Sequence, residues 1–145
     1  MGRLTVEELL AEARSSITRR SPAEARAAVA DGALIVNIRS DDARVRDGIV
    51  PGSLHLPRTV LEWRVAPGGD SRNPHVGDLD RELLVICDHG YSSSLAAATL
   101  VRLGFARAGD VIGGFEAWAA AGLPVSRPVR TRPPGELPGL APPDP

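Results

Sequence analysis

Residues 83–94 read Leu-Leu-Val-Ile-Cys-Asp-His-Gly-Tyr-Ser-Ser-Ser. The apolar first part of this stretch is short and partly β-branched, which predicts a central strand over residues 83–87. A polar turn follows, and the alanine-rich segment after it predicts a helix over residues 93–103 that ends at Gly104. The order strand, turn, helix places Cys87 beneath the free backbone N–H groups of a helix start.

Cys87 is the only cysteine of the chain, and its position supports two interpretations. Free N–H groups at a helix start favour negative charge, so they favour a thiolate or an anion carried on the sulfur. Cysteine is also among the most buried residue types, so Cys87 can simply close a core strand. Both interpretations stay open at this point.

The remaining sequence alternates short apolar runs with helical patterns. Capping-box patterns at Thr5–Glu8 and Ser21–Glu24 predict the starts of two helices. Continuous apolar runs predict buried strands, and such strands between helices favour a parallel sheet that is covered on both faces. The further expected elements are strands over 33–38, 53–56 and 110–112 and helices over 41–46, 59–64 and 115–121.

The same patterns divide the chain into three parts. We expect an N-terminal helical extension over residues 1–20 and one α/β domain over residues 21–125. From Ser126 onward the chain is rich in proline, arginine and glycine and shows no periodicity. We therefore expect a flexible tail over residues 126–145.

Composition excludes several classes of function. Acidic and basic residues nearly cancel, with a net charge of −1 and a pI of about 6.3, so no basic face for nucleic acid or an anionic membrane is expected. The chain has no lysine, which excludes Schiff-base chemistry and the P-loop. Heavy use of alanine, glycine, arginine and proline suggests a bacterial genome of high GC content.

The same composition bears on the cellular location. A single cysteine forms no internal disulfide, which fits a reducing cytosol. The N-terminus has no apolar signal region, and no stretch approaches the roughly 18 apolar residues of a membrane span. We expect a soluble, cytoplasmic protein.

Four separate segments together resemble the rhodanese-like family of sulfurtransferases, and their order and spacing agree from about Pro22 to Val125. Residues 36–39 are similar to the strand-ending Asp-x-Arg element of the family, with Asn37 in place of Asp. Residues 48–57 resemble its Gly-His-Ile-Pro-Gly-Ala segment, with Ile49 in place of His. Residues 87–93 resemble the active-site loop, and the last segment, residues 111–125, matches the C-terminal signature.

This resemblance implies both a fold and an activity. The fold is a five-stranded, mostly parallel sheet with helices on both faces. The activity is transfer of a sulfane sulfur, from thiosulfate or a persulfide donor to a thiol, cyanide or a protein acceptor, through a persulfide on Cys87. The backbone N–H groups of the residues after Cys87 would hold that persulfide; these residues are Asp88, His89, Gly90, Tyr91, Ser92 and Ser93. No metal or organic cofactor is implied, and Cys87 and His89 alone are too few ligands for zinc.

The loop departs from the family pattern in its charge. A typical loop reads Cys-x-x-Gly-x-Arg, whereas this chain keeps Gly90 but has Ser92 in place of the arginine. Asp88 adds a negative charge beside the thiol. A neighbouring charge shifts a pKa by about 1–3 units, so we expect a weaker anion site that still has its N–H groups and helix dipole.

A substitute cation is available elsewhere in the sequence. Ligands of open α/β sheets bind beyond the carboxyl ends of the strands, which is where the strand over 53–56 delivers Arg58. We predict that Arg58, or less readily Arg64, faces the Cys87 loop, although Arg58 can equally cap a turn and point to solvent. Arg39 is expected to be structural and to pair with Asp41 or Asp42, as the matching family arginine does.

Two further loop side chains keep alternative roles. His89 serves either as a donor to the substrate or weak base, or as a solvent-facing residue. Tyr91 belongs either to the pocket rim or to the surface.

Two other functions remain as alternatives to catalysis of sulfur transfer. A non-catalytic rhodanese-type module for interaction or sulfur sensing is favoured by Ser92. A phosphatase or arsenate reductase of the same fold needs an arginine six residues after the cysteine, and Ser93 stands there.

Overall fold

The strand predicted around residues 83–87 lies at the centre of the sheet. The computed structural model describes residues 2–128, and in it β4 (Leu83–Ile86) is the middle strand of a five-stranded sheet of order β1-β5-β4-β2-β3. All four neighbouring pairs are parallel, which confirms the predicted fold class. The other strands are β1 (Thr18–Arg20), β2 (Leu34–Asn37), β3 (Leu54–His55) and β5 (Gly109–Val111).

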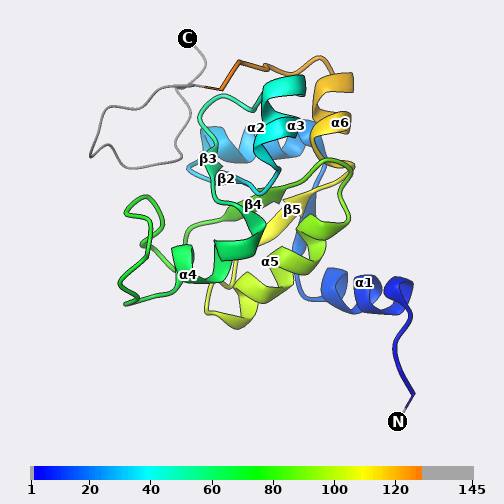
Figure 1. Cartoon of the computed structure of the whole chain (residues 1–145), viewed down its shortest axis with the longest axis vertical. Helices are drawn as coiled ribbons and strands as arrows, with labels where there is room; N and C mark the ends of the chain where they lie inside the picture. The colour runs from blue at the N-terminus through cyan, green and yellow to red at the C-terminus, as the bar shows by residue number, and fades with distance from the viewer. Residues whose placement is uncertain (1, 129–145) are drawn as a thin grey trace.

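Helices cover both faces of this sheet (Figure 1). On one face lie α4 (Leu61–Val65), which follows a 3-10 turn at Arg58–Val60, and α5 (Ser92–Arg102). On the other lie α2 (Pro22–Ala30) and α6 (Gly114–Ala120). Helix α3 (Asp41–Asp47) connects β2 to β3. Helix α1 (Val6–Ser15) packs against α5. The predicted capping boxes are present at the starts of α1 and α2.

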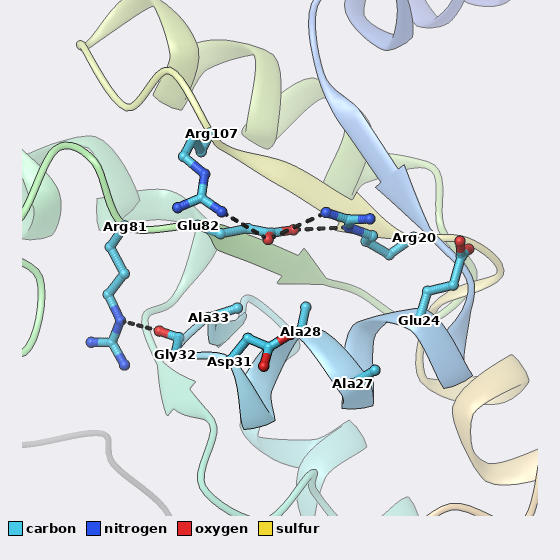
Figure 2. Close-up of a pocket in the computed structure, with 10 residues that line it drawn as sticks. All are labelled: Arg20, Glu24, Ala27, Ala28, Asp31, Gly32, Ala33, Arg81, Glu82 and Arg107. Atoms are coloured by element: carbon cyan, nitrogen blue, oxygen red, sulfur yellow. Dashed lines mark hydrogen bonds and ion pairs between the residues drawn. The ribbon is translucent and has the colours of Figure 1, made fainter.

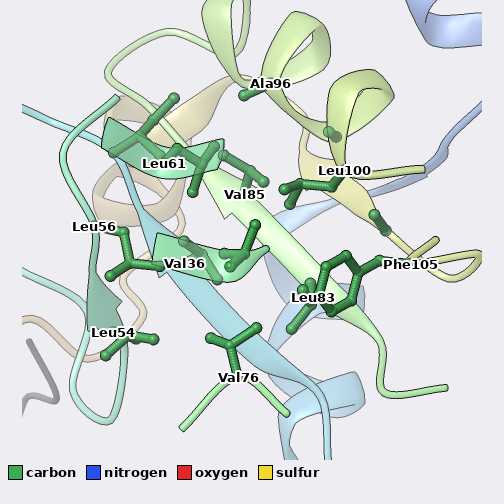
Figure 3. Packing of buried hydrophobic residues seen from close by; sticks show 14 of the residues in the cluster. Val36, Leu54, Leu56, Leu61, Val76, Leu83, Val85, Ala96, Leu100 and Phe105 are labelled. Carbon is green, nitrogen blue, oxygen red and sulfur yellow. The ribbon is translucent and has the colours of Figure 1, made fainter. Parts of the chain in front are cut away.

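The alternation of side chains along β4 decides which face Cys87 joins. Leu83 and Val85 belong to the core beneath α5, whereas Leu84 and Ile86 belong to the core beneath α2 and α6 (Figure 3 shows the first core). Side chains of a strand point alternately to opposite faces. Cys87 continues the α5 side of this alternation and is 5% exposed.

The predicted N-terminal extension contributes an edge strand to the sheet. β1 lies within residues 1–20 and pairs in parallel with β5 as an edge strand. The polar side chains of β1 gave no strand signal, and tertiary ion pairs hold them instead. Arg20 donates to the buried Glu82, which also pairs with Arg107 (Figure 2).

Ser126, which was expected at the start of the tail, pairs with Ile49 of the domain. Ser126 and Ile49 exchange two backbone hydrogen bonds of 2.8 and 2.9 Å, so residue 126 is part of the folded domain. The rest of the predicted tail, residues 129–145, lies outside the described residues.

The two tryptophans have opposite environments. Trp118 of α6 is 2% exposed, and its indole N–H donates to the Pro124 carbonyl at 2.8 Å. Trp63 of α4 is 65% exposed.

Candidate active site

Cys87 follows the central strand at the carboxyl end of the sheet, which is the usual edge for ligand sites in open α/β folds. An open hollow of about 280 Å³ lies above it. Five of the predicted site residues line this hollow, and Gly90 and Ser93 of the same loop donate to Cys87 from beside it. The hollow is lined by Ile38, Arg39, Cys87, Asp88, His89, Tyr91 and Ser92.

Two backbone N–H groups donate to the cysteine sulfur. The Gly90 N–H lies 3.1 Å and the Ser93 N–H 3.4 Å from Cys87 Sγ. Ser93 is in the first turn of α5, where N–H groups have no partner within the helix. The loop and the helix start therefore direct partial positive charge at the sulfur, as the sequence predicted.

The start of α6 fixes the opposite side of the loop. The Phe115 N–H donates to the Cys87 carbonyl at 2.8 Å, and the Glu116 N–H donates to the Asp88 carbonyl at 3.1 Å. In a trans peptide the C=O and the following N–H point in opposite directions, and no described peptide bond is cis. The N–H groups of Asp88 and His89 are therefore directed away from α6.

Glycine is required where the loop meets α6. Gly90 has φ +86°, and a Cβ there would lie 2.7 Å from the Gly113 nitrogen. A Cβ on Gly114, with φ +65°, would lie 2.6 Å from the Cys87 carbonyl oxygen. Gly90 of the Cys87 loop and Gly114 of α6 thus permit the backbones of these two segments to approach closely.

The surroundings of Cys87 lower the pKa of its thiol. Burial acts most strongly and raises the pKa, because it disfavours the charged thiolate. The hydroxyls of Ser93 and Ser92 and the N–H groups of Ser93 and Gly90 lower the pKa, and together they outweigh the burial. In the structure the Gly90 and Ser93 N–H groups donate to the sulfur, whereas the Ser93 hydroxyl donates to Asp110 at 2.8 Å.

The acidic residue after the cysteine is neutralised by an ion pair. Asp88 accepts from Arg39 Nε at 2.7 Å, and the Arg39 side chain is fully buried. Arg39 also pairs with Asp47 at 3.3 Å and lies 3.9 Å from the centroid of the Phe115 ring. Arg39 is structural as expected, but its partners are Asp47 and Asp88 and not Asp41 or Asp42.

The prediction that Arg58 faces the loop is not supported by the structure. Arg58 pairs with Glu62 one helical turn away, at 2.9 Å, and it does not line the hollow. Arg64 donates to the Ser71 carbonyl and also lies apart from the hollow. The local i, i+4 pairing of Arg58 with Glu62 was visible in the sequence and explains the difference.

Sequence reasoning missed three residues behind the loop. Arg14 Nη2 donates to the Gly90 carbonyl at 2.8 Å, and Arg19 Nη2 donates to the same oxygen at 3.2 Å. Asp110, with no exposed surface, accepts from Arg19 Nε at 2.9 Å. Asp110 also accepts from the hydroxyls of Ser93 and Ser94, both at 2.8 Å.

The two remaining loop side chains lie at the rim. His89 Nδ1 is 2.6 Å from Glu116 Oε2, and both side chains are exposed. Tyr91 is 63% exposed, with Arg14 5.8 Å from its ring centroid. His89 is therefore paired with a carboxylate at the mouth of the hollow.

A second hollow, of about 350 Å³, lies near the amino ends of β2, β4 and β5 (Figure 2). Its charges balance, since three arginines and three carboxylates line it. Within residues 2–128, no group of three or more His, Cys, Asp or Glu side chains is arranged to hold a metal ion. No helix in that part of the chain is long and apolar enough to cross a membrane.

Comparison with known proteins gives consistent matches over most of the chain. A family model described as a rhodanese-like domain matches residues 21–121. The thiosulfate sulfurtransferase GlpE of Pseudomonas entomophila (strain L48) is 39% identical over 104 residues, which cover 72% of this chain and 86% of that protein. The protein of the same name from Stutzerimonas stutzeri (strain A1501) is 40% identical over 100 residues, which cover 69% of this chain and 83% of that protein.

Solved structures share the fold. A protein of unknown function from Rhodopseudomonas palustris CGA009, described as a possible tyrosine phosphatase, superposes with a TM-score of 0.78 at 33% identity. That match covers 86% of this chain and 96% of that one. The polysulfide-sulfur transferase homodimer of Wolinella succinogenes superposes with a TM-score of 0.66 at 22% identity over 86% of this chain and 89% of that one, which shows likeness of fold alone.

Proposed function

This chain belongs to the rhodanese-like domain family. We propose that it is a sulfurtransferase that carries a sulfane sulfur on Cys87. The observation that carries the proposal is the pair of N–H groups that donate to Cys87 Sγ, from Gly90 and Ser93. Together with the lowered pKa of the thiol, they favour the thiolate that sulfur transfer needs.

The first half-reaction loads the enzyme. The Cys87 thiolate attacks the outer sulfur of thiosulfate, a new S–S bond forms, and the S–S bond of thiosulfate breaks with its electron pair leaving on sulfite. The product is a Cys87 persulfide anion, so charge and atoms balance. The N–H groups of Asp88, His89 and Tyr91, together with those on Sγ, would then stabilise the terminal sulfur.

The second half-reaction unloads it. An acceptor nucleophile, which is cyanide, a small thiolate or a protein thiolate, attacks the terminal sulfur. The S–S bond of the persulfide breaks, and its electron pair returns to Cys87 Sγ. Only sulfur nucleophiles, cyanide and the backbone take part, so the cycle requires no metal or organic cofactor.

The choice of thiosulfate as the first donor rests on the relatives, which are named thiosulfate sulfurtransferases. The phosphatase alternative lacks its arginine, because Ser93 stands at that position and its hydroxyl donates to Asp110. The structurally similar protein described as a possible tyrosine phosphatase therefore does not change the proposal.

The test is to incubate the protein with thiosulfate, to measure released sulfite and to weigh the intact chain. We expect a gain of one sulfur on the wild-type protein and one equivalent of sulfite. The matched control, Cys87→Ser, is expected to show neither. A wild-type protein that gains no sulfur from thiosulfate or from a persulfide donor would contradict the proposal. Such a result would favour the non-catalytic module that Ser92 suggests.

A further inference from the structure

Helix α1 brings a cation to the active-site loop from outside the region that the family model matches. That region begins at residue 21, and α1 spans Val6–Ser15. The helix packs against α5 (Figure 1), and Arg14 of its last turn reaches the loop. Arg14 Nη2 donates to the Gly90 carbonyl at 2.8 Å, and Arg14 Nε donates to Ser94 Oγ at 3.1 Å.

Arg14 differs in charge from the other arginines near the loop. Arg19 is neutralised by Asp110, and Arg39 by Asp88 and Asp47. Among the described residues, no carboxylate forms an ion pair with Arg14, whose contacts are the Gly90 carbonyl, the Ser94 hydroxyl and the ring of Tyr91. Arg14 therefore brings an uncompensated positive charge to the back of the loop.

The bond to the Gly90 carbonyl also fixes an orientation. That carbonyl belongs to the Gly90–Tyr91 peptide, which is trans, so the Tyr91 N–H is directed away from Arg14. A donor with full charge holds the carbonyl more firmly than a neutral donor does. The path from Arg14 through Gly90 to Cys87 Sγ is short: 2.8 Å to the carbonyl oxygen and 3.1 Å from the Gly90 nitrogen to the sulfur.

We propose that Arg14 is a positioning residue that replaces, from α1, the arginine that the loop lacks at Ser92. It holds the Gly90–Tyr91 peptide in place and supplies the positive charge that favours an anionic sulfur at Cys87. The role of this charge in sulfur transfer rests on the function proposed above.

The experiment measures the pH dependence of Cys87 alkylation by iodoacetamide in the full chain. Arg14→Gln removes the charge and keeps an amide donor, whereas Arg14→Lys keeps the charge. Both replacements are good helix formers, so α1 is expected to remain folded. The matched control is Arg102→Gln, which removes one exposed charge from α5.

Arg14→Gln is expected to raise the pKa of the Cys87 thiol by about half a unit to one unit. This is the size expected when a positive charge within about 10 Å of the sulfur is removed at an effective dielectric of about 20–40. At a pH below that pKa, alkylation then slows by about 3- to 10-fold, while the rate well above it stays at the wild-type value. In Arg14→Lys the rise of the thiol pKa is expected to be less than half of the rise in Arg14→Gln, because the positive charge is kept.

An unchanged thiol pKa in Arg14→Gln would overturn the proposal, and so would an equal shift in Arg102→Gln. A shift of the thiol pKa in Arg14→Lys as large as in Arg14→Gln would also contradict the proposal. A thermal melt of each variant checks that the fold is intact. Alkylation needs no sulfur donor. A wild-type protein that fails to load sulfur but shows the Arg14 shift would therefore refute the proposed function alone.

Discussion

Replacing Asp110 by asparagine is expected to destabilise the protein strongly, although Asp110 does not touch the hollow. Its carboxylate has no exposed surface and accepts from three side chains, those of Arg19, Ser93 and Ser94. An asparagine keeps the shape but loses the charge and directs an amide N–H₂ at one of these donors. The Arg19 guanidinium, 21% exposed, then loses its counter-ion.

The size of the effect follows from this burial. Removing one partner of a buried ion pair costs about 3–5 kcal/mol, and the partial exposure of Arg19 favours the lower end, about 3 kcal/mol. This is a large fraction of the roughly 5–15 kcal/mol by which a domain is stable. For an m value of about 1–3 kcal/mol/M, the urea midpoint should fall by at least about 1 M.

Urea unfolding followed by far-UV circular dichroism measures this loss. Asp70→Asn, at an exposed position, is the matched control and should change the free energy of unfolding by less than about 0.5 kcal/mol. In the double variant with Arg19→Met, part of the loss should be recovered, because the unpaired cation is gone. A loss below about 1 kcal/mol in Asp110→Asn, or strictly additive losses in the double variant, would refute the reasoning.

Three more outcomes are expected. The alkylation rate of wild-type Cys87 should be half-maximal at a pH below the ordinary thiol pKa of about 8.5, and it should fall as the pH drops through that midpoint. A midpoint at or above about pH 8.5 would contradict the donors assigned to Sγ. Gly90→Ala should lower the free energy of unfolding by more than about 1 kcal/mol and slow sulfur loading, since its Cβ would lie 2.7 Å from the Gly113 nitrogen at φ +86°; urea unfolding and intact mass measure both effects. Arg58→Ala should leave the KM for thiosulfate unchanged in a sulfite-release assay, because Arg58 pairs with Glu62 away from the hollow.

The sequence was most informative where local patterns carry the structure. The apolar run that ends in Cys87 predicted the central strand, and the polar turn with its serines predicted the helix start above it. The two N–H groups on the sulfur follow from that order of elements. The bounds of most elements agree to within one or two residues.

The sequence was least informative where contacts between residues far apart in the chain determine the structure. The strand Thr18–Arg20 is short and polar, and only its place beside β5 makes it a strand. Arg14 and Asp110 act on the loop from positions that no local pattern connects with it. The pairing of Ser126 with Ile49 is not visible in the sequence, because its hydrogen bonds join segments that are far apart in the chain.

The two tryptophans give the chain a built-in pair of optical reporters. Acrylamide should quench the emission of Trp63, which is 65% exposed, and spare Trp118, which is 2% exposed. Trp118 sits in the same short helix, α6, whose first N–H groups hold the Cys87 and Asp88 carbonyls. Quenched spectra taken before and after the thiol is modified therefore report on the backbone of the Cys87 loop in the unlabelled protein.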